Sequence, residues 1–329
     1  MLCAAALLAA AVPPGCTPPR GDVRIVVISD LNGPYGSTTY EPEVHQGVRL
    51  IREAWRPDLV LAAGDLVAGQ RPSLPDERVR AMWASFDSVV ARPLRDARIP
   101  FGFTVGNHDA SAHPAHRRDR ALAVDHWSAP GRHPGVAFVD SAHFPLFYTF
   151  RQGPVFVLAW DASYAGTAQD SALLHWVRAQ LEGPAARSAR IRLALGHLPL
   201  YAVAEERNRP GEVLAEPDSL RRILERHGVH TYISGHHHAY YPGRRGALEL
   251  LHAGALGQGA RPLIGSAAPP RQTITVLDFF FRTGSVTYST YAFEGGRLRP
   301  VDHDKLPPSI RGINGAIVRR DLPDTLGAR

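Results

Sequence analysis

Two kinds of hydrophobic pattern alternate along the chain. Short runs rich in Val, Ile and Leu end abruptly at glycine or a polar residue, which is typical of strands buried on both faces of a sheet. These runs predict strands at residues 23–28, 59–63, 102–105, 146–150, 155–160, 191–195, 229–234, 248–252, 273–280 and 285–293. Apolar residues at helical spacing separate several of the strands, at residues 44–55, 79–90, 173–181 and 220–224. The alternation of the two patterns predicts an α/β fold.

Three parts of the chain depart from this alternation. A Gly-Pro turn joins the strands at 146–150 and 155–160, which predicts an antiparallel hairpin. Residues 111–143 are rich in His, Arg, Pro and Gly, and predict an excursion over the face where the strands end, with one helix near 118–126. From residue 297 onward the chain is polar and weakly periodic, so we expect an extended tail there.

The length of the chain bounds its domain organisation. With 329 residues, of which 44% are hydrophobic, it can bury a sizeable core. We expect one folded domain at residues 21–296, with a leader at 1–20 and a tail at 297–329. The leader joins an apolar stretch to a proline-rich spacer, which favours an export signal over an alanine-rich leader without a targeting role. Its Cys16 follows a glycine, as in processed lipoproteins, although the neighbouring prolines fit that pattern poorly. We therefore expect an exported protein, in the periplasm or cell envelope, whose only membrane attachment would be a lipid anchor at Cys16.

Charge and cysteine content argue against nucleic-acid binding and against catalysis by a thiol. The net charge of +6 comes almost entirely from scattered arginines, because Lys305 is the only lysine. No run or helix face collects these arginines, so we expect no specific nucleic-acid binding. The charge still favours anionic substrates through a weak general attraction. Both cysteines, Cys3 and Cys16, lie in the leader, so catalysis must use other side chains.

Polar side chains follow five of the predicted strands directly. They are Asp30 with Asn32, Asp65, Asn107 with His108 and Asp109, His197, and His236 with His238. Ligands bind beyond the carboxyl ends of the strands in α/β sheets, so these side chains are expected to meet at one edge. Carboxylate, amide and imidazole groups together suit borderline divalent ions such as Mn, Fe or Zn. A shared carboxylate can also bridge two ions about 3.5–4 Å apart. A cap or a turn would explain any one residue equally well, but the repetition favours a metal site.

In chain order, the motifs Asp-x-Asn, Gly-Asp, Gly-Asn-His-Asp, Gly-His-x-Pro and Gly-His-x-His resemble the calcineurin-like metallophosphoesterase family. The resemblance extends over about residues 23–252. It implies an α/β sandwich of four layers, in which two mixed β-sheets are flanked by α-helices. It also implies two divalent metal ions, with Asp65 as the bridging ligand. Each ion would have further ligands of its own: Asp30 and His238 for the first, and Asn107, His197 and His236 for the second.

One position departs from the family pattern. The family normally has histidine two residues after the first aspartate, where this chain has Asn32. Asparagine can bind a metal through its carbonyl oxygen, but it is a weaker donor than imidazole toward these ions. The first ion could therefore be loosely held, exchangeable, or a harder ion such as Mn. The chain also has Ala68 where a purple acid phosphatase has a tyrosine, three residues after Asp65, so it does not resemble that subgroup.

The resemblance further implies a hydrolytic function. His108 would protonate the leaving oxygen or orient the substrate phosphate, and Asp109 would hold the His108 imidazole. A metal-activated hydroxide would attack a phosphomonoester or phosphodiester of a small molecule or a lipid. Two alternatives stay open. Asn32 could indicate a metal-binding protein with weakened turnover and a binding or regulatory role, and the site could instead hydrolyse a non-phosphate bond such as an amide. The proton donor His108 argues against lost turnover, because a pure binding site has little use for one.

Overall fold

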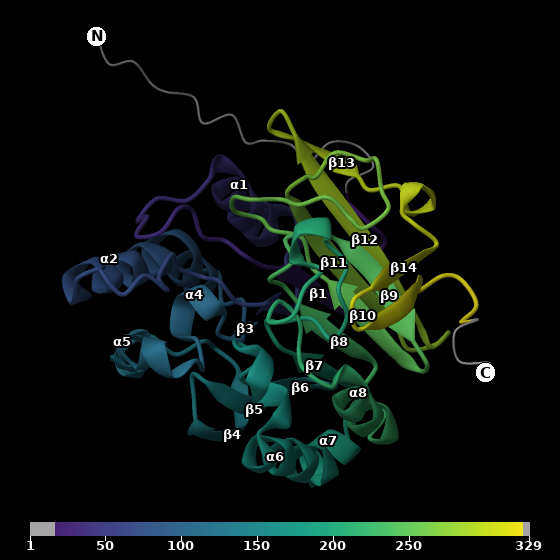
Figure 1. The fold of residues 1–329 in the computed structure, drawn as a ribbon, viewed down its shortest axis with the longest axis horizontal. Coiled ribbons are helices and arrows are strands. Elements are labelled where there is room, and N and C mark those ends of the chain that lie inside the picture. The colour runs from purple at the N-terminus through teal and green to yellow at the C-terminus, as the bar shows by residue number, and fades with distance from the viewer. Residues whose placement is uncertain (1–16, 325–329) are drawn as a thin grey trace.

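The computed structural model describes residues 17–324 (Figure 1). Two mixed β-sheets pack face to face, and helices cover the outer face of each sheet. In Figure 1, α1 and α2 lie on one side of the sheets, and α6, α7 and α8 lie on another. The expected α/β sandwich of four layers is confirmed.

The first sheet has the strand order β13-β12-β11-β1-β2-β3. Its strands are β1 (Val23–Ile28), β2 (Leu59–Ala62), β3 (Phe101–Phe103), β11 (Thr273–Phe280), β12 (Ser285–Glu294) and β13 (Arg297–Pro300). β1, β2 and β3 run parallel, so their carboxyl ends meet at one edge, whereas β11 is antiparallel to β1. The helical segments that follow these parallel strands are α1 (Pro42–Leu50) with η1 (Ile51–Trp55), α2 (Asp76–Phe86) with η2 (Asp87–Ala91), α3 (Arg92–Asp96), α4 (Asn107–Ala110), η3 (Pro114–His116) and α5 (Arg117–Ser128).

The second sheet has the strand order β14-β15-β9-β10-β8-β7-β6-β5-β4. Its strands are β4 (Ala137–His143), β5 (Phe147–Gln152), β6 (Val155–Ala159), β7 (Ile191–Leu195), β8 (Thr231–Ser234), β9 (Tyr241–Arg245), β10 (Leu248–His252), β14 (Ser309–Gly312) and β15 (Gly315–Arg319). β6, β7, β8 and β10 are parallel, and β5 and β6 form the predicted antiparallel hairpin. The remaining helical segments are η4 (Ala165–Gln169), α6 (Ser171–Glu182), α7 (Pro184–Arg187), η5 (Glu205–Arg207), α8 (Pro217–Arg226) and η6 (His303–Lys305).

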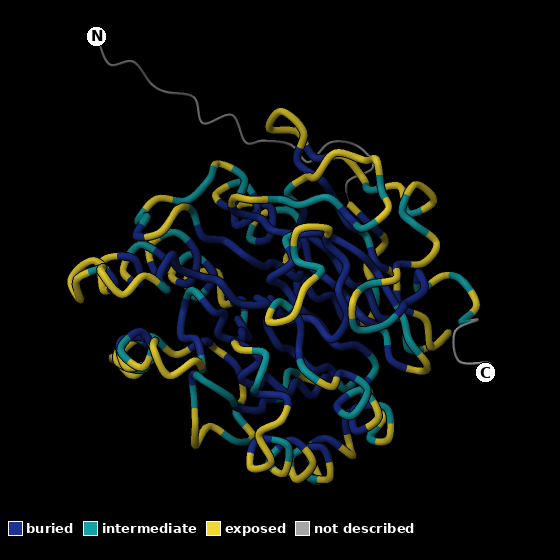
Figure 2. The backbone as a smooth tube through the Cα atoms, viewed as in Figure 1, coloured by how far each residue is buried: buried dark blue, intermediate teal, exposed yellow. Residues whose placement is uncertain are grey.

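Strand β1 shows why the buried strands could be predicted as nearly continuous apolar runs. Ile25 and Val27 point into the core between the two sheets, while Val26 and Ile28 pack against the helices of the first sheet. Successive side chains of a strand point to opposite faces, and both faces are covered here. The interior of the sandwich is accordingly buried, and exposed residues lie in loops, on the outer helix faces and on edge strands such as β4 and β13 (Figure 2).

The C-terminal segment is part of the fold, so the predicted tail from residue 297 is wrong for residues 297–319. β13 extends the edge of the first sheet, and β14 and β15 extend the second. Ile310 and Ile317 are buried in the core of the second sheet. These strands have only four or five residues, and several of their side chains face solvent. Such short, mixed segments lack the apolar runs that predicted the central strands.

We expect the buried C-terminal strand to contribute to stability. Ile317 is fully buried, so Ile317→Ala should lower the free energy of unfolding by about 2–5 kcal/mol through lost burial and a cavity. Ile313 lies four residues earlier and is 51% exposed, so Ile313→Ala should change it by no more than about 0.5 kcal/mol. Denaturant unfolding of both variants measures the difference. Equal, small effects would mean that the segment does not pack as described.

Among residues 17–324, no helix has the length and apolar character needed to cross a membrane. Cys16 and the apolar stretch of the predicted export signal lie outside the described residues. The export signal and the lipid anchor therefore stay predictions.

Candidate metal centre

The strand-end side chains from both sheets meet at one edge of the sandwich. The first sheet supplies carboxylates and an amide, and the second supplies imidazoles. In chain order these are Asp30 after β1, Asp65 after β2, Asn107 at the start of α4, His197 after β7, and His236 and His238 after β8. The two sheets are also joined directly here, because the backbone N–H of His236 donates to both carboxylate oxygens of Asp30 at 3.1 Å.

The candidate ligands form two clusters that share one carboxylate. Ligand atoms of Asp30, Asp65 and His238 lie within 4.8 Å of one another, and so do ligand atoms of Asp65, His197 and His236. Among the other short distances, His238 Nε2 lies 3.2 Å from Asp30 Oδ1, and His197 Nε2 lies 3.3 Å from Asp65 Oδ2. A carboxylate common to two clusters is suited to bridging a pair of ions.

Asn107 completes the second cluster. Its Oδ1 lies 2.9 Å from His197 Nε2 and 2.9 Å from His236 Nδ1. Its Nδ2 donates to Oε1 of Gln70 at 2.7 Å, which fixes the amide with its oxygen toward the imidazoles. The sequence carried no signal for Gln70, which lies in the loop after β2.

Backbone strain is concentrated at the same edge. Asp30, Asp65, His236 and His238 adopt positive φ angles of 49°, 53°, 64° and 52°. They make up four of the eight non-glycine residues with positive φ in the described part of the chain. This conformation is unfavourable for residues with a Cβ and persists where the surrounding structure imposes it, often at functional sites. The fold thus holds these side chains in place at the expense of local backbone energy.

The glycines of the motifs permit the close packing of these loops. A Cβ at Gly106 would overlap the carboxylate of Asp65, and one at Gly235 would overlap the Ser29 hydroxyl. Gly106 and Gly235 immediately precede Asn107 and His236. Both positions therefore require glycine for the approach of neighbouring loops.

Two of the histidines are oriented by backbone carbonyls. Nδ1–H of His197 is positioned to donate to the carbonyl of Ala63 at 2.7 Å. Nδ1 of His238 lies 3.0 Å from the carbonyls of both Gln258 and Gly259. A proton on Nδ1 leaves the Nε2 lone pair of each ring directed at the cluster, as a metal ligand requires.

The electrostatics of the cluster also suit a cation. Burial raises the pKa of Asp65, but the charges of His197 and His108 outweigh that effect and hold it well below its usual range. Burial lowers the pKa of His197, yet the neighbouring carboxylate of Asp65 raises it to about 9. The buried carboxylates thus favour positive charge, which a divalent ion would supply.

Asn32, where the family pattern breaks, also fits a cation. The residue is only 7% exposed, and its Oδ1 is buried without a hydrogen-bond partner among residues 17–324. An unsatisfied buried acceptor is unfavourable by about 1–3 kcal/mol, so such an atom indicates a missing partner. Together with the donor set of the two clusters, this orphaned oxygen agrees with a site built for metal ions.

Substitution of Asn32 by histidine tests its role as a ligand. Because imidazole is a stronger donor toward borderline ions, Asn32→His should tighten the weaker metal-binding step by about tenfold, or 1.4 kcal/mol. Asn32→Ala should weaken the same step. Calorimetric titration of the metal-free chain with Mn²⁺ measures both. Identical affinities in the two variants and the natural chain would exclude Asn32 as a ligand.

His108 faces the cluster from the start of α4. Its Nε2 lies 3.9 Å from Asp65 Oδ2, and its ring stacks on Tyr35 with the centroids 5.0 Å apart. Its Nδ1 is buried without a hydrogen-bond partner among the described residues. The ring is therefore held by stacking on Tyr35 and by packing.

The prediction that Asp109 holds the His108 imidazole is wrong. Asp109 Oδ1 accepts from the N–H of Val67, and Oδ2 accepts from the N–H of Gly106, both at 2.8 Å. Gly106 is the N-cap of α4 and Asp109 its third residue, so the carboxylate turns back to cap the helix. Burial, together with the charge of Asp65, raises the pKa of Asp109 to about 7. Asp109 thus fixes the two loops that carry Asp65 and Asn107.

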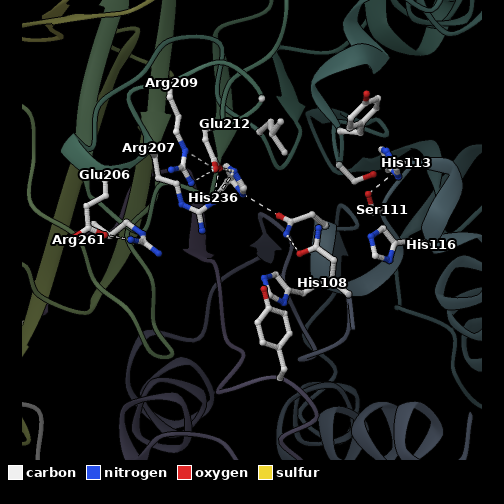
Figure 3. A pocket seen from close by; sticks show the side chains of 17 residues that line it. His108, Ser111, His113, His116, Glu206, Arg207, Arg209, Glu212, His236 and Arg261 are labelled. Carbon is white, nitrogen blue, oxygen red and sulfur yellow. Dashed lines mark hydrogen bonds and ion pairs between the residues drawn. The ribbon is translucent and has the colours of Figure 1, made fainter. Parts of the chain in front are cut away.

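A cavity of 660 Å³ opens beside the cluster (Figure 3). One part of its wall carries Tyr35 and His108, and another carries Arg207, Arg209 and Arg261. Ser111, His113 and His116, from the predicted excursion at 111–143, also line it. The first part of the excursion thus borders the site as expected, and its predicted helix is α5, but residues 137–143 form β4 at the edge of the second sheet instead.

Together, the four-layer sandwich and the clustered ligands at its edge define a protein of the metallophosphoesterase class. Residues 23–240 match the family model for calcineurin-like phosphoesterases, and the chain belongs to that family.

Solved structures with a similar fold include metallophosphatases. One is a purple acid phosphatase from yellow lupin (Lupinus luteus) seeds, with 14% identity and a TM-score of 0.58 over 84% of this chain and 52% of the lupin chain. This chain therefore spans about half the length of the lupin protein. Another is a dimetal phosphatase from Danio rerio, with 15% identity and a TM-score of 0.52 over 85% of this chain and 98% of that one. At these identities the likeness concerns the fold alone. The curated proteins that were compared include no match.

Proposed function

We propose that this chain is a metal-dependent phosphoesterase that hydrolyses phosphomonoester or phosphodiester bonds at a dinuclear site. The observation that carries the proposal is the carboxylate of Asp65, which belongs to both ligand clusters and lies beside His108. Paired ions held by a shared carboxylate are suited to in-line displacement at phosphorus.

The ligands divide between two ions. Asp30, Asp65, His238 and Asn32 would hold the first, and Asp65, Asn107, His197 and His236 would hold the second. When bound, Mn, Fe or Zn ions would act as Lewis acids and lower the pKa of water toward neutrality. The mixed oxygen and nitrogen donors favour ions of this borderline group.

The chain's own residues supply proton transfer and substrate positioning. His108 lines the cavity beside Asp65 and is kept in place by Tyr35, so it would donate a proton to the leaving oxygen. Arg207, Arg209 and Arg261 line the same cavity and outnumber their partners Glu206 and Glu212, so the remaining positive charge would attract an anionic substrate. The substrate is a small-molecule or lipid phosphoester. The leader sequence supports export to the periplasm or cell envelope as a further part of the proposal.

Metal analysis of the purified chain, combined with a panel of phosphomonoesters, phosphodiesters and amides in added Mn²⁺, tests this function. We expect hydrolysis of at least one phosphoester, which a chelator abolishes and Mn²⁺ restores. Metal binding without any hydrolysis would support a binding or regulatory protein instead. Hydrolysis of an amide but of no phosphoester would show that the site cleaves a non-phosphate bond.

A further inference from the structure

The three candidate histidine ligands differ in what holds the ring nitrogen that points away from the cluster. Backbone carbonyls hold His197 and His238 through Nδ1. His236 has the opposite orientation, with Nδ1 toward Asn107 and Nε2 only 2.8 Å from Oε2 of Glu212. His236 is therefore the one ligand of the three that a carboxylate orients.

Glu212 is itself held firmly on the cavity wall. Its carboxylate forms ion pairs with Arg207 and, at 2.9 Å, with Arg209. Its backbone carbonyl lies 3.0 Å from Nε2 of His237, the buried neighbour of His236. Glu212 is thus a fixed acceptor paired with two guanidinium groups, and its contacts with Arg207 and His236 can be followed in Figure 3.

We propose that Glu212 is a positioning residue that selects the metal-binding form of His236. A carboxylate that is paired with two guanidinium groups acts as an acceptor, so its contact with His236 requires the proton of the ring on Nε2. Nδ1 then keeps its lone pair, directed at the second ligand cluster. The negative charge also increases the electron density of the imidazole and strengthens it as a donor. This inference rests on the dinuclear site of the proposed function.

A purely structural role for Glu212 would lead to a different effect on metal binding. The ion pairs with Arg207 and Arg209 could simply anchor the loop between η5 and α8. Loss of that anchor would destabilise the loop without affecting one ion in particular. If Glu212 acts through His236, its loss should affect the second ion, because Asp30 and His238, which would bind only the first ion, do not contact Glu212.

Titration of the full-length, metal-free chain with Zn²⁺ alone separates these possibilities. In the natural chain we expect two binding steps. Glu212→Gln keeps the shape of the side chain but removes its charge, and should weaken one step by about 10–100-fold while leaving the other unchanged. When both are loaded with Co²⁺, Glu212→Gln and the natural chain should differ in the visible absorption of one of the two ions.

Two variants serve as matched controls. Glu206→Gln removes a carboxylate from the same cavity, where it pairs with Arg261 and not with a candidate ligand. Arg209→Gln breaks an ion pair of Glu212 but leaves the contact with His236. Both should bind metal as the natural chain does.

Each outcome bears on a definite statement. The role of Glu212 would be overturned if Glu212→Gln bound both ions with the affinities of the natural chain, or if it weakened both binding steps equally. It would also be overturned if Arg209→Gln lost as much metal affinity as Glu212→Gln. Failure of the natural chain to bind any divalent ion would overturn the dinuclear site, and the inference with it. Metal binding without hydrolysis by the natural chain would affect the proposed function alone.

Discussion

Asp65→Asn is expected to lower kcat/KM for phosphoester hydrolysis by about 10³-fold or more, equivalent to about 4 kcal/mol of transition-state stabilisation. Asp65 is the single residue common to both ligand clusters. Asparagine has nearly the same shape, but it replaces one carboxylate oxygen with an amide nitrogen that cannot bind a metal and removes the negative charge. The variant should therefore also retain fewer ions, as elemental analysis after dialysis would show.

An exposed aspartate provides the control for this substitution. Asp125 pairs with Arg80 at the surface, with its side chain 57% exposed, and Asp125→Asn should keep both activity and metal content. Full metal occupancy in Asp65→Asn would remove Asp65 from the ligand set. Full activity in that variant would contradict the proposed chemistry altogether.

The part of the site that lies on buried parallel strands could be predicted from sequence. A strand such as β1 has an apolar run on both faces, and its end at Ser29-Asp30 marks the edge of the sheet to within a residue. The same reasoning located His197 after β7 and His236 after β8, because parallel strands bring their carboxyl ends together. Local sequence was sufficient to place these residues, because the apolar run marks where each strand ends and the parallel topology brings those ends together.

Residues that act on the site from loops could not be predicted in this way. Glu212 and Gln70 reach His236 and Asn107 from irregular segments, where no periodicity indicates the direction of a side chain. Their partners lie 24 and 37 residues away, so only the folded chain brings them together. Asp109 is different, because Gly106 with an acidic residue three positions later is a recognisable helix-capping pattern. The proximity of Asp109 to His108 in sequence favoured the wrong partner.

His108→Ala is expected to separate catalysis from metal binding. The variant should lose about 10²–10⁴-fold in kcat, as is typical when a general acid is removed. Its metal content should stay normal, because position 108 reaches Asp65 Oδ1 through its backbone N–H at 2.9 Å, and alanine retains that hydrogen bond. The imidazole itself makes no hydrogen bond through Nδ1 within the described chain, so its removal leaves no buried partner unsatisfied.

The leaving group determines how large this loss should be. A nitrophenolate leaves readily without a proton, whereas an alkoxide does not, so His108→Ala should impair an alkyl phosphate far more than a nitrophenyl phosphate. Measuring kcat for both substrates, with metal content determined on the same samples, tests the assignment. An equal loss on both would indicate that His108 orients the phosphate instead of donating the proton. Full activity on both would exclude His108 from the mechanism, even though its ring lies beside Asp65 in the cavity.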